Sequence, residues 1–416
     1  MSQRTVSITI DELRVGVTCS HPVEDDHGVL LLGANTRITD QVINGLRDRG
    51  IKMIEVDPRD LAAMRGGAKK KATTRRERND QDGWPKSKPV KDMLVDRHDE
   101  DLSDERNEHL QNSMQVAKQQ FEQLRQQIAE NAILSVGEFR ELSDVYARSM
   151  VDDHDQTVGV IGTLSKICEP EERAVRMSVL GMAIAIEMGL DGHQTLEVGM
   201  TALLHDIGLY AMDPRLHKPV ELMDESEQWE YRKHPLVSVH CISEVMEVAE
   251  SIQLAMQQVH EQFDGSGYPR GVKGQRIHSY ARILNVVDAY LQLTGATTDR
   301  RAIVPHDALG LMLHQAGRGI FDPKVMRAFL NIETMFPLGS IVELNSGELA
   351  RVIRRPRTGF SQPVLQGLDG NRIELESNRL QVVRPVCDPQ VEQIRLHPQQ
   401  MRRSDWHPSS HHALVV

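Results

Sequence analysis

In residues 134–335 of this 416-residue chain, apolar residues recur at helical spacing. This is the longest part of the chain with a single pattern. Met177, Leu180 and Ile184, for example, follow one another at intervals of three and four residues. Such residues lie on one face of a helix, whereas strand side chains repeat on every second residue. The sequence therefore predicts one all-α domain over residues 134–335.

The two flanks of this region have strand patterns instead. In residues 1–57, Val6 and Ile8 alternate with polar residues, and Thr39 is a suitable N-cap for a short helix. Residues 336–388 contain short apolar runs that are separated by turn residues, as in an antiparallel hairpin. The fold class that we expect is multidomain, with a central helical domain between a small N-terminal α+β module and a small C-terminal β module.

Three further segments carry weaker patterns. Residues 58–104 contain a basic run and then an acidic run with few large apolar residues, which predicts a charged flexible linker. Residues 389–416 are rich in Gln, Pro, His and Ser and are expected to be disordered. Residues 105–133 form a heptad helix, and its seam consists of Leu110, Met114, Ala117, Phe121, Leu124 and Ile128. This seam predicts either a homodimer through residues 105–133 or a helix that packs on the neighbouring domain.

Charge and cysteine content exclude some classes of function. The net charge of −11 argues against a protein that binds nucleic acid through its overall field. The four cysteines are far apart in the sequence, which argues against a disulfide scaffold and fits a reducing cytoplasm. We expect no signal peptide and no membrane span, and therefore a cytoplasmic protein.

Two polar motifs interrupt the helical region. His205-Asp206 follows an apolar run at the expected end of a helix, and His260 precedes the segment Asp264-Gly265-Ser266-Gly267-Tyr268-Pro269. Imidazole and carboxylate groups are ligands for iron, manganese, zinc and similar ions. The glycines allow the backbone to come close to a ligand.

These motifs resemble those of the HD-GYP family, a branch of the HD metal-dependent phosphohydrolases. The resemblance covers roughly residues 140–335 and includes His234-Pro235 and the segment that ends in Val287-Asp288. It implies a helical HD-type domain that hydrolyses cyclic di-GMP with divalent Fe, Mn or Zn. It also implies contact with diguanylate cyclase domains through the Gly265–Gly271 loop.

The resemblance also implies roles for individual residues. The implied metal ligands are His205, Asp206, His234, His260 and Asp288, with Asp206 also catalytic, and Glu169 stands where some members have a further carboxylate ligand. Tyr268, Gly267 and Arg300 would face the nucleotide.

Five positions depart from the family pattern, and three of them concern the metal site. Arg173 stands where the first histidine ligand is expected, Val259 replaces one histidine of a pair, and Leu209 replaces a lysine. The guanidinium of Arg173 is expected to pair with the nearby carboxylates and to replace metal charge. The sequence therefore predicts an incomplete metal-ligand set.

Two hypotheses follow from this pattern. The chain is either a metal-dependent cyclic di-GMP phosphodiesterase, or a catalytically inactive module that binds cyclic di-GMP or docks a partner without turnover. Metal content and product formation distinguish the two.

Overall fold

The computed structural model describes most of the chain. The described residues are 5–10, 13, 16–25, 30–34, 36–48, 51, 53–60, 83–132, 134–162, 169–218, 220–243, 245, 248–296, 301–375, 379–389, 391–403 and 406–408. The chain divides into two compact units, Met1–Gly83 and Trp84–Val416.

The N-terminal unit is a small α+β module. Its four-stranded antiparallel sheet has the order β1-β6-β3-β4, with strands β1 (Val6–Thr9), β6 (Met53–Val56), β3 (Val23–Glu24) and β4 (Leu30–Leu32). A second pair joins β2 (Thr18–Cys19) to β5 (Thr36–Arg37), and helix α1 spans Asp40–Asp48. The hydroxyl of Thr39 accepts a hydrogen bond from the Val42 amide at 3.2 Å, as expected of an N-cap.

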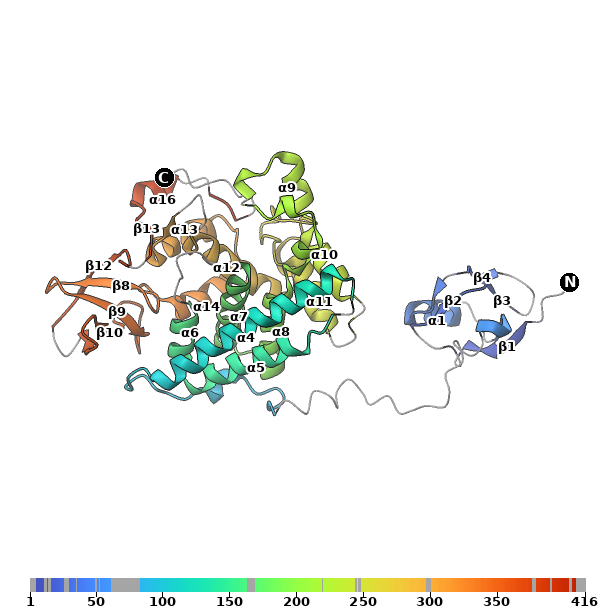
Figure 1. Cartoon of the computed structure of the whole chain (residues 1–416), viewed down its shortest axis with the longest axis horizontal. Coiled ribbons are helices and arrows are strands. Elements are labelled where there is room, and N and C mark those ends of the chain that lie inside the picture. The colour runs from blue at the N-terminus through green and yellow to red at the C-terminus, as the bar shows by residue number, and fades with distance from the viewer. Residues whose placement is uncertain are drawn as a thin grey trace. The chain divides into compact units, whose positions relative to one another are not determined.

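The second unit is built mainly of helices (Figure 1). They are α4 (Asp104–Ala129), α5 (Gly137–Asp152), α6 (His154–Gly162), α7 (Pro170–Glu187), α8 (Gly192–Leu204), α9 (Glu225–Tyr231), α10 (His234–Ile242), α11 (Glu250–Gln258), α12 (Ser279–Thr294), α13 (Pro305–Gly317) and α14 (Pro323–Glu333). The expectation of a central helical domain with strand-rich flanks is confirmed. Among the described residues, no helix has the length and apolar character that a membrane crossing requires.

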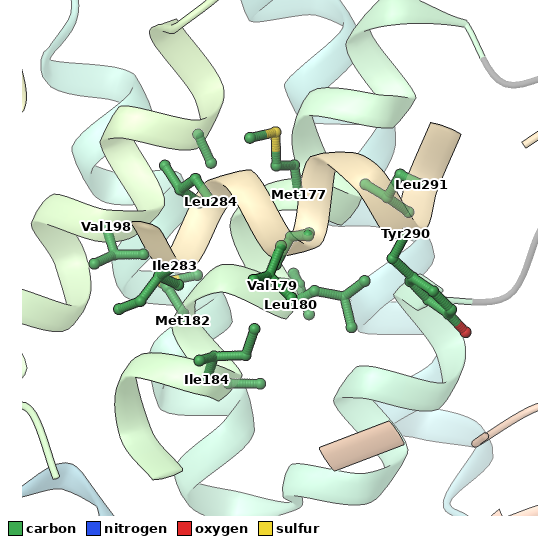
Figure 2. Close-up of a cluster of buried hydrophobic side chains, with 14 of the residues drawn as sticks. Met177, Val179, Leu180, Met182, Ile184, Val198, Ile283, Leu284, Tyr290 and Leu291 are labelled. Atoms are coloured by element: carbon green, nitrogen blue, oxygen red, sulfur yellow. The ribbon is translucent and has the colours of Figure 1, made fainter. Parts of the chain in front are cut away.

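The core of this unit lies where α7, α8 and α12 meet. Figure 2 shows the buried side chains of these helices, among them Leu180, Val198 and Leu284. Almost every residue of α7 from Ala174 to Ile186 is buried, so this helix is surrounded by others. Such a core keeps the ends of the helices in fixed positions, which matters because the polar motifs lie at those ends.

Helix α4 is part of the helical domain. Four of its seam residues are buried within the same chain, namely Leu110, Ala117, Phe121 and Leu124. Phe121, for instance, packs edge-on against Phe139 of α5, with ring centroids 5.0 Å apart. The structure therefore shows the second of the two expected arrangements, a helix packed on the neighbouring domain.

The segment before α4 also belongs to this unit, although the sequence predicts a linker up to residue 104. Trp84 is buried and its indole donates a hydrogen bond to Asp144 at 2.7 Å, while Val90 is fully buried in a short 3₁₀ turn, η3 (Val90–Met93). The helical unit therefore begins at Trp84. Apolar burial of Trp84 and Val90 and the ion pair of Arg97 with Asp152 both join this otherwise charged segment to the domain.

The C-terminal β module has five antiparallel strands in the order β11-β10-β9-β8-β12. They are β8 (Ile341–Leu344), β9 (Leu349–Arg354), β10 (Val364–Gly367), β11 (Arg372–Glu374) and β12 (Val382–Val386). Arg354 joins this module to the helices, because its fully buried guanidinium pairs with the buried carboxylate of Asp153.

The tail corrects a second expectation from the sequence. Residues 391–403 and 406–408 are described and ordered against the helices: β13 (Gln393–Ile394) pairs with β7 (Ala302–Ile303), and α16 spans Pro398–Arg403. The carboxylate of Asp307 binds the guanidinium of Arg395, and Trp406 is buried. The tail is polar in composition, but a few residues, such as Arg395 and Trp406, hold it on the helices.

Candidate metal centre

Four elements bring the predicted polar residues together. Helix α8 begins with a capping box, in which Asp191 and Gln194 bond to each other's backbone amides, and it ends at Leu204. His205 and Asp206 therefore follow directly at its C-terminal end. His234 begins α10, His260 follows the end of α11, and Asp288 lies within α12.

Two glycines allow the backbone to come close at this point. A Cβ atom on Gly208 would lie 2.4 Å from the Ser238 amide nitrogen, so the turn after Asp206 reaches α10 only because residue 208 is glycine. A Cβ atom on Gly267 would lie 2.4 Å from the His260 carbonyl oxygen. Both distances are shorter than any real contact, and a side chain at either position would push His234 or His260 away from the centre.

The Asp206 carboxylate is surrounded by three imidazoles. Its Oδ2 lies 3.1 Å from Nε2 of His205, and its Oδ1 lies 3.1 Å from Nε2 of His234 and 3.5 Å from Nε2 of His260. The Nε2 atoms of His234 and His260 are themselves 2.9 Å apart. The three side-chain nitrogens thus converge on one small volume beside one carboxylate.

Backbone carbonyls fix the orientation of two of these rings. Nδ1 of His205 lies 2.8 Å from the Ala202 oxygen, and Nδ1 of His234 lies 2.8 Å from the Tyr231 oxygen. A carbonyl accepts only from N–H, so Nδ1 of each ring carries a proton and Nε2 is directed toward Asp206. Nε2 of His205 is buried and has no hydrogen-bond partner among the described residues.

These residues fit a metal ion. One donor atom each from His205, Asp206 and His260 lies within 4.8 Å of the other two, and the buried Nε2 of His205 makes no hydrogen bond among the described residues. His234 lies outside this close group, but its Nε2 is 3.1 Å from Oδ1 of Asp206 and offers a further donor. Three imidazoles and one carboxylate are a donor set that iron, manganese and zinc share.

Asp288 has a different partner. The Nη2 atom of Arg173, in the first turn of α7, lies 2.5 Å from Oδ1 of Asp288 and 3.1 Å from its carbonyl oxygen. The Asp288 side chain is 7% exposed and that of Arg173 is 25% exposed. The sequence expectation that this guanidinium lies against a carboxylate of the centre therefore agrees with the geometry at Asp288.

The protonation states follow from these contacts. Burial lowers the pKa of His260, but its bonds to Asp206 and Asp288 outweigh burial and raise it to about 9. Burial raises the pKa of both carboxyls, yet His205 and His234 hold the pKa of Asp206 well below its ordinary value, and Arg173 does the same for Asp288. Burial also lowers the pKa of His234. At neutral pH two carboxylates thus face two cations, Arg173 and protonated His260.

Tyr268 and Gly267 lie behind His260. The Tyr268 ring is 7% exposed and stacks on the His260 ring, with centroids 5.0 Å apart and planes 10° apart. The Tyr268 amide donates to the His260 carbonyl at 3.1 Å. Tyr268 thus packs on His260, and its predicted role of facing a nucleotide stays a prediction. Arg300, predicted for the same role, lies outside the described residues.

The remaining predicted positions lie as follows. The Glu169 side chain, at the N-cap of α7, is 61% exposed and its Oε2 lies 3.5 Å from Nζ of Lys118. It is absent from the group of close donor atoms among the described residues. Val259 is fully buried at the end of α11, and Leu209 lines a pocket beside the centre.

That pocket is the feature that the sequence did not reveal. It has a volume of about 410 Å³ and is lined by His205 and Asp206 together with Phe121 and Arg125 of α4. Its other described lining residues are Pro170, Arg173, Ala174, Leu203, Ile207, Leu209, Tyr210, Leu216, His217, Lys218 and Tyr231. The spacing of four residues between Phe121 and Arg125 is a signal that both share one face of α4.

A bundle of helices whose ends bring His-Asp and further histidines together defines a class, the HD domains. A model of that family, described as HD domain, matches residues 164–325. This match, the intact Asp264–Pro269 motif and the relatives described next support an HD-GYP domain in this part of the chain.

The chain is 32% identical over 183 residues to the cyclic di-GMP phosphodiesterase PA4108 of Pseudomonas aeruginosa, which covers 44% of each chain. It is 25% identical over 213 residues to the cyclic di-GMP phosphodiesterase PdeB of Borreliella burgdorferi, covering 51% of this chain and 56% of that one. It is 30% identical over 173 residues to the 3'3'-cGAMP-specific phosphodiesterase 1 of Vibrio cholerae, covering 41% and 40%. The chain thus spans about half the length of the curated relatives that it matches.

Proposed function

We propose that the chain is a metal-dependent phosphodiesterase of cyclic di-GMP that works with one divalent cation. The observation that carries this proposal is the convergence of His205, His234 and His260 on the Asp206 carboxylate. The substrate is proposed from the names of relatives. The first two relatives described above are named as cyclic di-GMP phosphodiesterases.

His205, Asp206, His234 and His260 would hold the cation. A divalent cation in this position polarises a phosphodiester oxygen and lowers the pKa of water. The carbonyls of Ala202 and Tyr231 keep His205 and His234 in the tautomer that binds. His260 must give up its proton when a cation binds, because only the neutral ring has a lone pair to donate.

Arg173 limits the site to one cation. Its guanidinium is permanently charged and pairs with Oδ1 of Asp288, so Asp288 already has a cationic partner. Fixed positive charge at this point repels a second metal ion but attracts a phosphate. The reaction that we propose breaks one P–O3' bond by the attack of water on phosphorus, and the 3'-oxygen leaves as a hydroxyl group.

The test is metal content and turnover of the same protein sample. The chain is purified without oxygen and measured by elemental mass spectrometry, and the conversion of cyclic di-GMP to linear product is followed by chromatography. About one equivalent of Fe, Mn or Zn together with turnover supports the proposal, provided that Asp206→Ala loses both.

Absence of metal in both proteins, including after reconstitution, would overturn the proposal. The other hypothesis, a catalytically inactive module that binds cyclic di-GMP or docks a partner, would then remain. A parallel assay with 3'3'-cGAMP decides between the two kinds of substrate that the relatives' names describe.

A further inference from the structure

The pocket beside the metal centre has more positive than negative groups. Among the described residues that line it, Asp206 is the only carboxylate, whereas Arg125, Arg173 and Lys218 are cations. Lys218 is paired with Glu227 at 2.7 Å and Arg173 with Asp288 at 2.5 Å. The third cation, Arg125, comes from α4, which lies outside the matched residues 164–325.

The Arg125 guanidinium has three side-chain contacts, of which the first joins its Nη1 atom to Oε2 of Glu122 at 3.8 Å. Its Nη2 atom pairs with Oε1 of Glu171, and its guanidinium lies over the Tyr210 ring, with Cζ 4.8 Å from the ring centroid. The Tyr210 hydroxyl donates to the same Glu171 oxygen at 3.1 Å. The Arg125 side chain remains 47% exposed, whereas that of Glu171 is 12% exposed. Glu171 therefore anchors the guanidinium from behind and leaves part of it accessible from solvent.

We infer that Arg125 binds the second phosphate of the dinucleotide, the one that is not cleaved. This inference rests on the proposed function, in which the first phosphate lies at the cation held by Asp206. A cyclic dinucleotide carries two phosphates on opposite sides of one ring, so a pocket that binds it needs positive charge in two separate places. Arg125 supplies the second place, because it lines the same pocket as Asp206 from the α4 wall.

The geometry favours a phosphate over a purely stacking contact. One face of the guanidinium already lies on Tyr210, and a planar fork with five N–H donors keeps donors for an oxyanion after one pairs with Glu171. A guanidinium fixed in advance loses little side-chain entropy when it binds.

The experiment compares a substrate that has two phosphates with one that has a single phosphate. Arg125→Ala and Arg125→Lys are assayed with cyclic di-GMP and with bis(p-nitrophenyl) phosphate. Arg125→Ala should raise KM for cyclic di-GMP by about 10- to 100-fold, the range expected when a charged hydrogen bond is lost, and change kcat little. Hydrolysis of bis(p-nitrophenyl) phosphate should stay within about twofold of wild type, and Arg125→Lys should recover part of the loss.

Two variants separate a binding role from a structural one. Glu171→Gln keeps an oxygen that accepts from Arg125 but removes a negative charge beside the bound phosphate, so it should lower the Kd for cyclic di-GMP. Lys118→Ala is the matched control, because Lys118 is an exposed α4 cation paired with a carboxylate and does not line the pocket. Lys118→Ala should hydrolyse both substrates as wild type does.

Equilibrium dialysis with cyclic di-GMP in the presence of chelator keeps the test independent of turnover. Binding without hydrolysis in wild type would contradict the proposed function alone, and a higher Kd in Arg125→Ala would still support the role of Arg125. Hydrolysis that is equal in wild type and Arg125→Ala would overturn this inference alone. An equal loss on both substrates, or weaker binding in both Arg125→Ala and Glu171→Gln, would show a structural role and also overturn it. If wild type neither binds nor hydrolyses cyclic di-GMP, the proposed function and this inference are both overturned.

Discussion

The two carboxylates of the centre have opposite surroundings. Asp206 faces three imidazoles, which are neutral ligands or cations according to pH, and its side chain is 33% exposed next to a pocket. Asp288 is 7% exposed and binds a guanidinium that is always charged. An imidazole can exchange its proton for a metal ion, but a guanidinium cannot. The Asp206 side of the centre is therefore suited to an exchangeable cation, and the Asp288 side carries a built-in one.

The largest effect is expected at Asp206. Asp206→Ala should remove the metal and reduce turnover by more than the roughly 10- to 100-fold that is usual for changes behind a metal ligand. Elemental analysis and the chromatographic assay measure both. Retention of metal by the variant would show that the three histidines bind it without the carboxylate, and the contrast with Asp288 would lose its basis.

The next test gives Asp288 imidazole neighbours, like those of Asp206, in place of a guanidinium. Arg173→His combined with Val259→His should raise the metal content from about one equivalent towards two and should increase turnover. Before metal is added, the variant should lose about 2 kcal/mol of unfolding free energy. This is below the ~3–5 kcal/mol of a fully buried pair because a quarter of the Arg173 side chain is exposed. Unchanged metal content would refute the claim that Arg173 excludes a second cation.

A smaller and graded effect is expected from pH. The pKa of His260 is raised to about 9, so cation binding must displace its proton at lower pH. The affinity for Mn²⁺ should therefore rise about tenfold per pH unit between pH 7 and 8.5 and level off above pH 9. The pKa values of Asp206 and Asp288 are lowered and do not contribute in this range. An affinity that does not change with pH would mean that His260 is not a ligand.

The same shifts give the sign for stability without metal. The raised pKa of His260 stabilises the fold fully below its ordinary value near 6.5, and this contribution disappears as the pH rises through about 9. The lowered pKa values of the two carboxyls stabilise the fold above about pH 4, and this contribution disappears in acid. Thermal unfolding in the presence of chelator measures both limbs.

The smallest effect is expected at Glu169. Its side chain is 61% exposed and its ion pair with Lys118 has a distance of 3.5 Å, so Glu169→Ala should change unfolding free energy by less than about 1 kcal/mol. Metal content should stay the same. Loss of metal in this variant would make the Glu169 carboxylate a part of the metal centre. The contrast between the surroundings of Asp206 and Asp288 would then be weaker.

The sequence was a good guide to local features. The helical periodicity of residues 134–335, the cap at Thr39 and the order of His205, Asp206, His234, His260 and Asp288 are all properties of short segments. The structure has the corresponding helices and brings the five polar residues together. It was a poor guide at residues 84–103 and in the tail, where isolated Trp84 and Trp406 decide the outcome against a polar composition.

What the sequence by itself determined is the set of helices and the kinds of side chain at their ends, because spacing and capping act over a few residues. Only the tertiary structure decided which partner each side chain meets. Arg173 and Asp288 are 115 residues apart, and Arg125 and Glu171 are 46 apart. Such pairs form because buried faces of α4, α7, α8 and α12 pack in one arrangement, and close packing fixes positions that no local pattern specifies.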